Sequence, residues 1–505
     1  MKRANPAMRM SCARLAGTRY CATSSGRIRS LQFSYYCHAV PGDRAKRGRL
    51  GTHNPQAGGH RSRHALPGAS RRELGRDDAA CVDIGDAICV RLDEICHSKG
   101  GDHAGCRSTH RWQARSSHLE TWSWRSPRRE AVSNPPPAEI GASVAEVETP
   151  TLVIVLDALD RNIAKMAEFA RSCGVRVRPH AKTHKCTAIA LRQIAHGAVG
   201  QCVQKVGEAE VLVRGGIKDV LVSNQVVGER KLRRLAALAQ EASIALCFDA
   251  AEQVDTASRV ARDFGITLGA LVEIEVGMER CGIAPGREAA VLARRIADAP
   301  NLDFRGLQAY QGRAQHLPTY RERAQAIAFA IDAVRETLRS LAAENLKCDI
   351  IGGAGTGTFA LEAASGVYNE LQVGSYVFMD TEYARIGGRD GGRYAEFEHS
   401  LFVLASVISA PTADRAIVDA GLKSYSAERG PPWVHNLADV EVTGVSDEHG
   451  RLKLGPNAQR LSIGEKIWLI PGHCDPTVNL HDWYVGVRNG RVEALWPINA
   501  RGASI

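Results

Sequence analysis

A cationic segment, RPHAKTHK over residues 178–185, follows the alternating run at residues 175–177. An amine acts as a nucleophile only after it loses its proton, and neighbouring positive charges lower the pKa of a lysine. If the strand continues, side-chain alternation places Arg178, His180 and Lys182 on one face. We therefore predict that crowding lowers the proton affinity of Lys182 and makes it a nucleophile. The alternative is a group of solvated loop cations.

A glycine-rich segment, IGGAGTGTF over residues 351–359, has the composition of a phosphate-binding loop. Its four glycines leave backbone N–H groups around Thr356 free to form an anion-binding nest. The later segment QVGSY contains Gly374, where a missing side chain would let a phosphate approach closely. A phosphate site facing a lysine fits pyridoxal 5'-phosphate, a phosphorylated aldehyde held as a Schiff base.

Two further segments carry polar groups of the kind found at active sites. In PGHCDP, an extended chain would project His473 and Asp475 to one side and Cys474 to the other, so that imidazole and carboxylate share a divalent ion. The alternative is a turn that satisfies its own hydrogen bonds. In GMERCG, Arg280 is placed to face a phenolate or a carboxylate, or else is a surface arginine.

A repeating fold is needed to position these segments. From residue 149 to about 395, short β-branched runs alternate with amphipathic stretches, the first of which ends at Gly174. Eight such runs with helices between them predict an α/β fold, a parallel (β/α)8 TIM-like barrel, with a doubly wound sheet as the alternative. In a barrel, reactive side chains lie where strands end, and the loops after strands seven and eight form the usual phosphate site.

Beyond residue 395 the pattern changes to strands alone. Asn489-Gly490 between alternating apolar residues is typical of a two-residue hairpin turn. We predict a barrel domain over residues 145–390 and a C-terminal β domain over 395–505 that carries the metal site, with residues near 145–156 as a candidate to pair with it.

The first 140 residues have a different composition from the rest. They contain 24 Lys and Arg against 12 Asp and Glu, whereas the remaining residues contain 41 against 43. They lack sustained periodicity, which predicts a basic extension that is disordered or not part of the native protein. A transit peptide and a nucleic-acid-binding tail are weaker alternatives.

Seven of the 14 cysteines lie after residue 140. They are scattered singly and are expected to be reduced thiols of a cytoplasmic protein. No run of roughly 20 apolar residues indicates a membrane span, and no secretory signal is evident.

Several segments together resemble one enzyme family: RPHAKTHK, VEIEVGMERCG, NELQVGSYVFMD and PGHCDPTVNLHDWYVGVRNG. From about residue 145 onward the chain is similar to the fold-type III pyridoxal-phosphate enzymes of the D-threonine aldolase, 3-hydroxy-D-aspartate aldolase and D-serine dehydratase group. Their barrel resembles that of alanine racemase. The resemblance covers none of residues 1–140.

The resemblance implies specific roles for residues of this sequence. Lys182, rather than Lys185, carries the cofactor, and His180 is a neighbouring proton carrier. Gln372 stands where alanine racemase has an arginine facing the ring nitrogen, and a neutral partner would weaken the electron sink. The implied cofactor-binding residues are Lys182, Arg280, Tyr310, Gly355, Thr356, Gln372, Gly374, Ser375 and Tyr376.

The resemblance also favours one reaction. The dehydratases have His and Cys two positions apart as zinc ligands, whereas His473 and Asp475 form the aldolase-like pair, and a hard carboxylate favours Mg²⁺ or Mn²⁺. We therefore expect an aldolase that cleaves 3-hydroxy-D-aspartate to glycine and glyoxylate, or D-threonine to glycine and acetaldehyde. Arg313 is a candidate for the second substrate carboxylate.

The expected partner is a small amino-acid substrate, without nucleic acid or membrane, and the resemblance implies a homodimer. The alternatives are a D-serine or 3-hydroxyaspartate dehydratase and a pyridoxal-phosphate-binding protein without catalysis.

Overall fold

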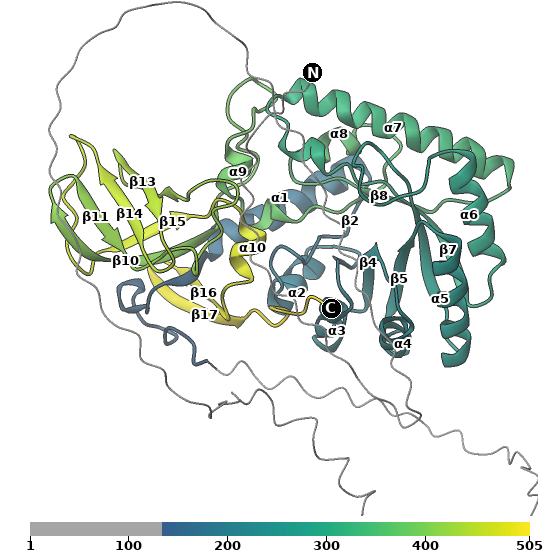
Figure 1. The fold of residues 1–505 in the computed structure, drawn as a ribbon, viewed down its shortest axis with the longest axis horizontal. Helices are drawn as coiled ribbons and strands as arrows, with labels where there is room; N and C mark the ends of the chain where they lie inside the picture. Colours follow the sequence, from purple (N-terminus) through teal and green to yellow (C-terminus); the bar gives the residue numbers. More distant parts are fainter. Residues whose placement is uncertain (1–133) are drawn as a thin grey trace, which may run out of the picture. The chain divides into compact units, whose positions relative to one another are not determined.

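The computed structural model describes residues 134–505, so the predictions for residues 1–133 lie outside the described part of the chain. Figure 1 shows two kinds of architecture in this part, a barrel of strands and helices followed by a domain of strands. The helices are α1 (Leu156–Cys173), α2 (Thr187–Ala195), α3 (Val206–Arg214), α4 (Glu229–Leu238), α5 (Ala251–Phe264), α6 (Arg287–Asp298), α7 (Tyr320–Ala343), α8 (Phe359–Ala363), α9 (Thr381–Ala384) and α10 (Cys474–Val478).

Eight parallel strands form the barrel in the order β2-β9-β8-β7-β6-β5-β4-β3. A parallel bridge between His180 and Cys202 joins the chain after β2 to β3 and closes the ring. The predicted (β/α)8 barrel is therefore confirmed, and the doubly wound alternative is wrong. The strands are β2 (Arg176–Val177), β3 (Gln201–Val203), β4 (Asp219–Gln225), β5 (Ser243–Phe248), β6 (Leu268–Glu273), β7 (Leu302–Gln308), β8 (Ile350–Gly353) and β9 (Glu370–Leu371).

The helices pack outside the barrel through their apolar faces. In α1 the buried positions include Leu159, Ile163, Met166 and Ala170, which recur at helical spacing. The helix ends at Gly174, whose φ of 66° is the left-handed conformation that glycine adopts without strain. This helix and its end agree with the sequence prediction.

The strands of the second domain form a sheet that includes a segment from before the barrel. Strand β1 (Thr151–Val155) pairs antiparallel with β10 (Leu401–Thr412) and parallel with β16 (Trp483–Arg488). Asn489 and Gly490, with φ of 50° and 72°, join β16 to β17 as expected of a hairpin. The other strands are β11 (Arg415–Val418), β12 (Trp433–Val434), β13 (Val440–Val445), β14 (Gly450–Leu454), β15 (Lys466–Ile470) and β17 (Arg491–Pro497).

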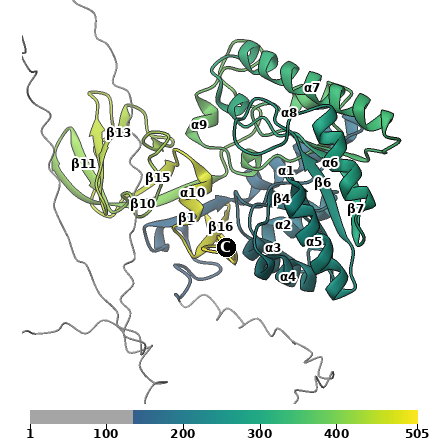
Figure 2. The same cartoon turned by 45° about the vertical axis from the view of Figure 1, so that its right-hand side comes forward.

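The short helix α10 lies between this β sheet and the barrel, as the turned view in Figure 2 shows. Its N-terminal region contacts the chain after β9, because the backbone N–H of Thr381 donates to the carbonyl of Pro471 at 3.1 Å. Residues of the second domain thus reach the C-terminal ends of the barrel strands, where a barrel carries its active site. Within residues 134–505, no helix has the length and apolar composition to cross a membrane.

Candidate active site

A cavity of about 280 Å³ lies at the ends of the barrel strands. It contains both the lysine and the glycine-rich loop singled out in the sequence. Its lining residues are His180, Lys182, Gln204, Ser223, Arg280, Gln308, Tyr310, Gly355, Thr356, Gln372, Gly374, Ser375 and Tyr383.

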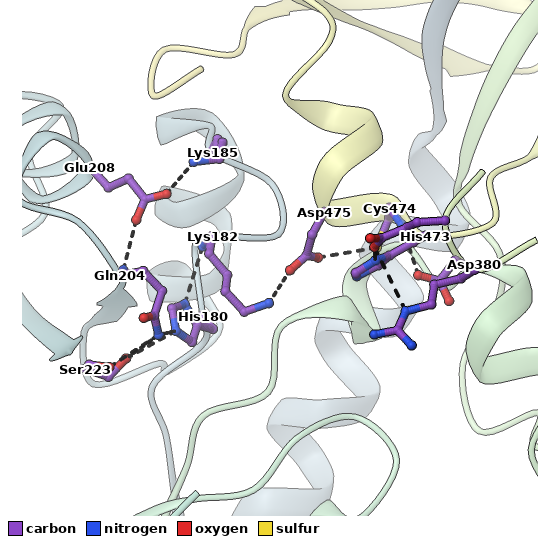
Figure 3. Close-up of polar contacts among 12 residues, drawn as sticks. His180, Lys182, Lys185, Gln204, Glu208, Ser223, Asp380, His473, Cys474 and Asp475 are labelled. Carbon is purple, nitrogen blue, oxygen red and sulfur yellow. Dashed lines mark hydrogen bonds and ion pairs between the residues drawn. The ribbon is translucent and has the colours of Figure 1, made fainter. Parts of the chain in front are cut away.

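Lys182 extends from the barrel toward α10 and forms an ion pair with Asp475 (Figure 3). Burial is the largest single influence and lowers the pKa of Lys182, but the charge and hydrogen bond of Asp475, together with Tyr310, outweigh burial and the net shift is upward. Burial raises the pKa of Asp475, and the charge of Lys182 reverses that shift, so its pKa falls below the usual range. The prediction that crowding lowers the proton affinity of Lys182 is wrong in this structure, because the nearest charge is an anion.

Arg178 does not share the face of Lys182 as predicted. Strand β2 ends at Val177, and the Arg178 guanidinium is buried between two carboxylates. Its Nε donates to Glu370 Oε1 at 2.8 Å, and Nη1 pairs with Asp219. The charge of Arg178 is therefore neutralised by these partners, and it adds little repulsion at the lysine.

His180 is buried, and both of its ring nitrogens have hydrogen-bond partners. Nε2 lies 2.9 Å from Gln204 Nε2 and 3.2 Å from Ser223 Oγ, while Nδ1 accepts from the backbone N–H of Lys182 at 3.4 Å (Figure 3). Burial, followed by the charge of Lys182, lowers the pKa of His180 well below its usual value. The imidazole is neutral and holds the turn that presents Lys182.

Lys185 forms an ion pair with a buried carboxylate outside the cavity. Its Nζ lies 2.5 Å from Oε1 of the buried Glu208, whose other oxygen accepts the backbone N–H groups of Gln204 and Lys205 (Figure 3). Lys185 is outside the cavity lining. Of the two lysines in the cationic segment, the structure places only Lys182 in the cavity.

The glycine-rich loop supplies a polar group that matches a bound anion. The Thr356 hydroxyl is buried at the cavity and has no hydrogen-bond partner in the structure. A Cβ at Gly374 would lie 2.5 Å from Thr183 Oγ1, so this glycine is required by the cationic segment behind it. The orphaned hydroxyl and the adjacent Gly355 and Ser375 fit a phosphate group.

The other predicted cofactor residues lie in different places. Gln372 and Gln308 exchange two hydrogen bonds of 2.7 and 2.8 Å at the cavity wall. Tyr376 lies outside the lining, where its hydroxyl accepts from Gln193 at 3.1 Å and its ring packs against Phe397. The structure therefore brings Gln372 to the cavity but not the ring of Tyr376.

Arg280 lines the cavity and contacts Glu273 and Tyr310. Its Nη2 lies 3.7 Å from Oε1 of the buried Glu273, and its guanidinium carbon lies 5.9 Å from the centroid of the Tyr310 ring. Arg313, by contrast, pairs with Glu279 at 2.9 Å, is exposed and does not line the cavity.

The segment of His473 and Asp475 is extended only at His473, because helix α10 begins at the next residue and includes Asp475. Cys474 begins α10 because the buried Asp380 accepts its backbone N–H at 3.0 Å. Asp475 nevertheless faces Lys182, and Glu428 Oε1 lies 2.6 Å from His473 Nδ1. Glu428 thereby leaves Nε2 of His473 available for another partner. Within the described residues, no group of three or more His, Cys, Asp or Glu side chains is arranged to hold a metal.

A histidine that the sequence analysis did not identify lies near the same position. His316 Nδ1 is 3.0 Å from Glu382 Oε1, and its ring lies 5.5 Å from that of Tyr383, a cavity residue. Burial, and then the charge of Arg429, lower the pKa of His316 to about 4. His316 is thus a neutral imidazole next to the Glu382 carboxylate, although this contact lacks hydrogen-bond geometry and Nδ1 has no hydrogen-bond partner.

Comparison with known proteins agrees with this geometry. Residues 154–382 match the family "Alanine racemase, N-terminal domain", and residues 400–487 match "Putative serine dehydratase domain". The 3-hydroxy-D-aspartate aldolase of Paracoccus denitrificans (strain Pd 1222) is 45% identical over 72% of this chain and 95% of its own length. The D-threonine aldolase of an Arthrobacter species is 45% identical over 74% and 98%. The chain belongs to the D-threonine aldolase and 3-hydroxy-D-aspartate aldolase family.

The structural similarity has the same extent. The crystal structure of D-threonine aldolase from Filomicrobium marinum is 45% identical, with a TM-score of 0.72, and covers 74% of this chain and all of that chain. The alanine racemase-like barrel of the aldolase family implies pyridoxal phosphate. Lys182, the orphaned Thr356 hydroxyl and Gln372 in one cavity fit that cofactor.

One sequence signal could have identified His316 in this aldolase-family chain. It lies in YQGRAQH, directly after β7, and a barrel carries functional residues after its strands. Its neighbour Glu382 lies more than 60 residues later in the sequence. The local pattern could therefore not predict the contact between His316 and Glu382.

Proposed function

We propose that this protein cleaves the Cα–Cβ bond of a D-3-hydroxy amino acid, using pyridoxal phosphate and a divalent metal, to give glycine and an aldehyde. The observation that carries the proposal is the meeting of Lys182 from the barrel with Asp475 from the C-terminal domain (Figure 3). This contact supports the proposal, because an amine that would bind the cofactor lies beside a carboxylate that would bind the metal. A protein that only bound the cofactor would not need the second group.

The cavity residues divide into groups that would hold different parts of the cofactor. Lys182 would bind its aldehyde carbon, Thr356 and Ser375 its phosphate, and Gln372 its ring nitrogen. Pyridoxal phosphate supplies the electron sink for bond cleavage. After cleavage, the freed Lys182 amine is positioned to return a proton to Cα and form glycine.

His473 and Asp475 are the residues that would hold Mg²⁺ or Mn²⁺. The Glu428 carboxylate would accept a hydrogen bond from Nδ1–H of His473, which fixes the ring and leaves Nε2 as the ligand atom, an arrangement common around metal-binding histidines. A divalent ion would lower the pKa of the substrate β-hydroxyl. With two protein ligands from residues 134–505, the ion would keep coordination positions for substrate and water oxygens.

Two histidines are candidates to accept the β-hydroxyl proton. The neutral His316 has Glu382 beside Nδ1, so that Nε2 can act as a base and the carboxylate can stabilise the imidazolium. His180, the proton carrier that the family resemblance implies, already has partners on both ring nitrogens. We therefore assign an orienting role to His180 and propose as the base His316, which lies outside the cavity lining but packs against the cavity residue Tyr383.

We infer that 3-hydroxy-D-aspartate is preferred over D-threonine, as the similarity of the segment around His473 to 3-hydroxy-D-aspartate aldolase suggests. The test is to supply both substrates and compare glyoxylate release with acetaldehyde release. A higher kcat/KM for 3-hydroxy-D-aspartate supports the preference, and a higher value for D-threonine overturns it. Arg313→Ala should leave the ratio unchanged, because Arg313 lies outside the cavity lining.

We further propose a homodimer in a reducing compartment such as the cytoplasm. All seven cysteines of the described residues are free, which supports such a compartment. The dimer rests on resemblance alone.

A further inference from the structure

The glycine-rich loop is supported from behind by a chain of buried side chains that the proposed reaction does not use. Gln315, fully buried, accepts the backbone N–H of Gly357 at 2.9 Å and donates to Thr358 Oγ1 at 2.7 Å. Thr358 Oγ1 in turn donates to Glu362 Oε1 at 2.7 Å. Because the backbone N–H of Gly357 can only donate, it fixes the direction of each hydrogen bond in this series, and Glu362 Oε1 is the final acceptor.

This series of buried side chains determines the shape of the glycine-rich loop as well as its hydrogen bonds. A Cβ at Gly355 would lie 2.5 Å from Gln315 Oε1, and one at Gly357 would lie 2.6 Å from the Gln315 carbonyl oxygen. Gln315 thus packs directly against the back of the loop. The front of the loop, with Gly355 and the orphaned Thr356 hydroxyl, faces the cavity.

Glu362 is an unusual residue to find behind an anion site. Its side chain is 1% exposed, and its Oε2 is buried without a hydrogen-bond partner. The titratable side chains that interact with it from neighbouring elements are the tyrosines Tyr310, Tyr368 and Tyr394, none of which supplies a cation. Buried Arg323 lies over the Tyr394 ring and donates to backbone carbonyls instead.

We propose that Glu362 is a positioning residue for the phosphate of the cofactor: its neutral form holds the loop for phosphate binding, and its ionised form opposes the phosphate dianion. The consequence is that phosphate binding takes up a proton at Glu362 from solvent. This inference rests on the proposed function, since it concerns the site of the same cofactor. Burial, against the weaker effect of the Thr358 hydrogen bond, raises the pKa of Glu362 to about 7, so the switch falls near neutral pH.

The experiment compares pyridoxal phosphate with pyridoxal on the cofactor-stripped full chain, by quenching of protein fluorescence between pH 6 and 8.5. Both ligands use Lys182, so the ratio of their Kd values isolates the phosphate. Glu362→Gln keeps an acceptor for Thr358 and removes the charge. Relative to wild type, its preference for the phosphorylated ligand should rise by up to about 30-fold at pH 8.5 and stay within twofold at pH 6.

Further variants separate positioning from folding. Thr358→Val should weaken pyridoxal phosphate binding at every pH and leave pyridoxal binding unchanged, and Thr358→Ser should restore it. Glu344→Gln, at the exposed end of α7, is the matched control and should follow wild type. If Glu362→Gln does not fold, wild-type calorimetry in buffers of different ionisation enthalpy should show pyridoxal phosphate taking up about 0.8 proton more than pyridoxal at pH 7.5.

The outcomes distinguish this inference from the proposed function. Parallel pH profiles for wild type and Glu362→Gln, or equal proton uptake for both ligands, would overturn the role of Glu362 and leave the aldolase proposal standing. Failure of wild type to bind pyridoxal phosphate at any pH would overturn both.

Discussion

The two lysines of the cationic segment differ in their partners more than in their sequence context. Lys182 faces Asp475 at the cavity, whereas Lys185 pairs with the buried Glu208. The sequence pattern was enough to identify the segment, and the family resemblance selected Lys182. The nature of the neighbouring charge was not predictable, because Asp475 is almost 300 residues away along the chain.

A matched pair of substitutions separates the lysines. Lys182→Ala should abolish the covalent adduct that borohydride reduction traps from pyridoxal phosphate, and mass spectrometry should locate the wild-type adduct on Lys182. Lys185→Ala should keep the adduct but lower the free energy of unfolding by about 3–5 kcal/mol, because Glu208 would be left buried and unpaired. An adduct on Lys185 would contradict this assignment.

Substitutions of His316 and His180 should have different effects on kcat and on cofactor binding. His316→Asn should reduce kcat by roughly 10²–10⁴ while pyridoxal phosphate affinity stays unchanged, since a general base acts only in the chemical step. His180→Asn should chiefly weaken cofactor binding, because it frees the turn of Lys182. Steady-state kinetics together with cofactor titration measure both. A His316→Asn enzyme within threefold of wild type would exclude His316 as the base.

Metal affinity should depend on Glu428. Glu428→Gln is expected to weaken Mn²⁺ binding about 10- to 100-fold, because His473 loses the carboxylate that orients its ring. Titration calorimetry of the full chain measures the change. Glu441→Gln, on the exposed face of β13, serves as control. Equal Mn²⁺ affinity in both variants would show that Glu428 is only a surface partner of His473.

At the scale of elements, the alternation of strands and helices was sufficient to predict the barrel. Gly174 was sufficient to predict where α1 ends. One local expectation was wrong for a tertiary reason. His473 is extended, but helix α10 begins directly after it at Cys474, whose backbone N–H donates to the buried Asp380. Asp380 lies more than 90 residues before Cys474 in the sequence, so the local pattern could not reveal this contact.

The short helix α8 should make stability depend on pH through Glu362. A carboxyl whose pKa is raised on folding contributes stability that is present below its unfolded pKa near 4.5 and lost as pH rises through about 7. The free energy of unfolding of Glu362→Gln, measured relative to that of wild type, should therefore rise by up to about 3 kcal/mol between pH 5 and pH 8.5. Urea unfolding at the two pH values measures this gain, and a constant difference would contradict it.

For the whole molecule, both domains contribute to one site. In the proposed site, the barrel supplies Lys182, the glycine-rich loop and His316 beside Tyr383, and the C-terminal domain supplies His473 and Asp475. Strand β1, which precedes the barrel, is part of the C-terminal sheet. The barrel alone should therefore lack the metal ligands and activity.

Residues 134–505 should suffice for function. The fragment contains both family matches and every residue of the proposed site. We expect its kcat/KM to lie within twofold of the full chain, measured by glyoxylate release at equal cofactor and Mn²⁺. A loss of tenfold or more would mean that residues 1–133 contribute to the active enzyme.

The measurement that tests the central claim most directly is product analysis of 3-hydroxy-D-aspartate turnover by the purified full chain, with Mn²⁺ and with EDTA. The aldolase account predicts glycine and glyoxylate in equal amounts, formed with Mn²⁺ and lost with EDTA. Oxaloacetate and ammonia instead would show elimination by a dehydratase and contradict the assignment of His473 and Asp475 to carbon–carbon bond cleavage.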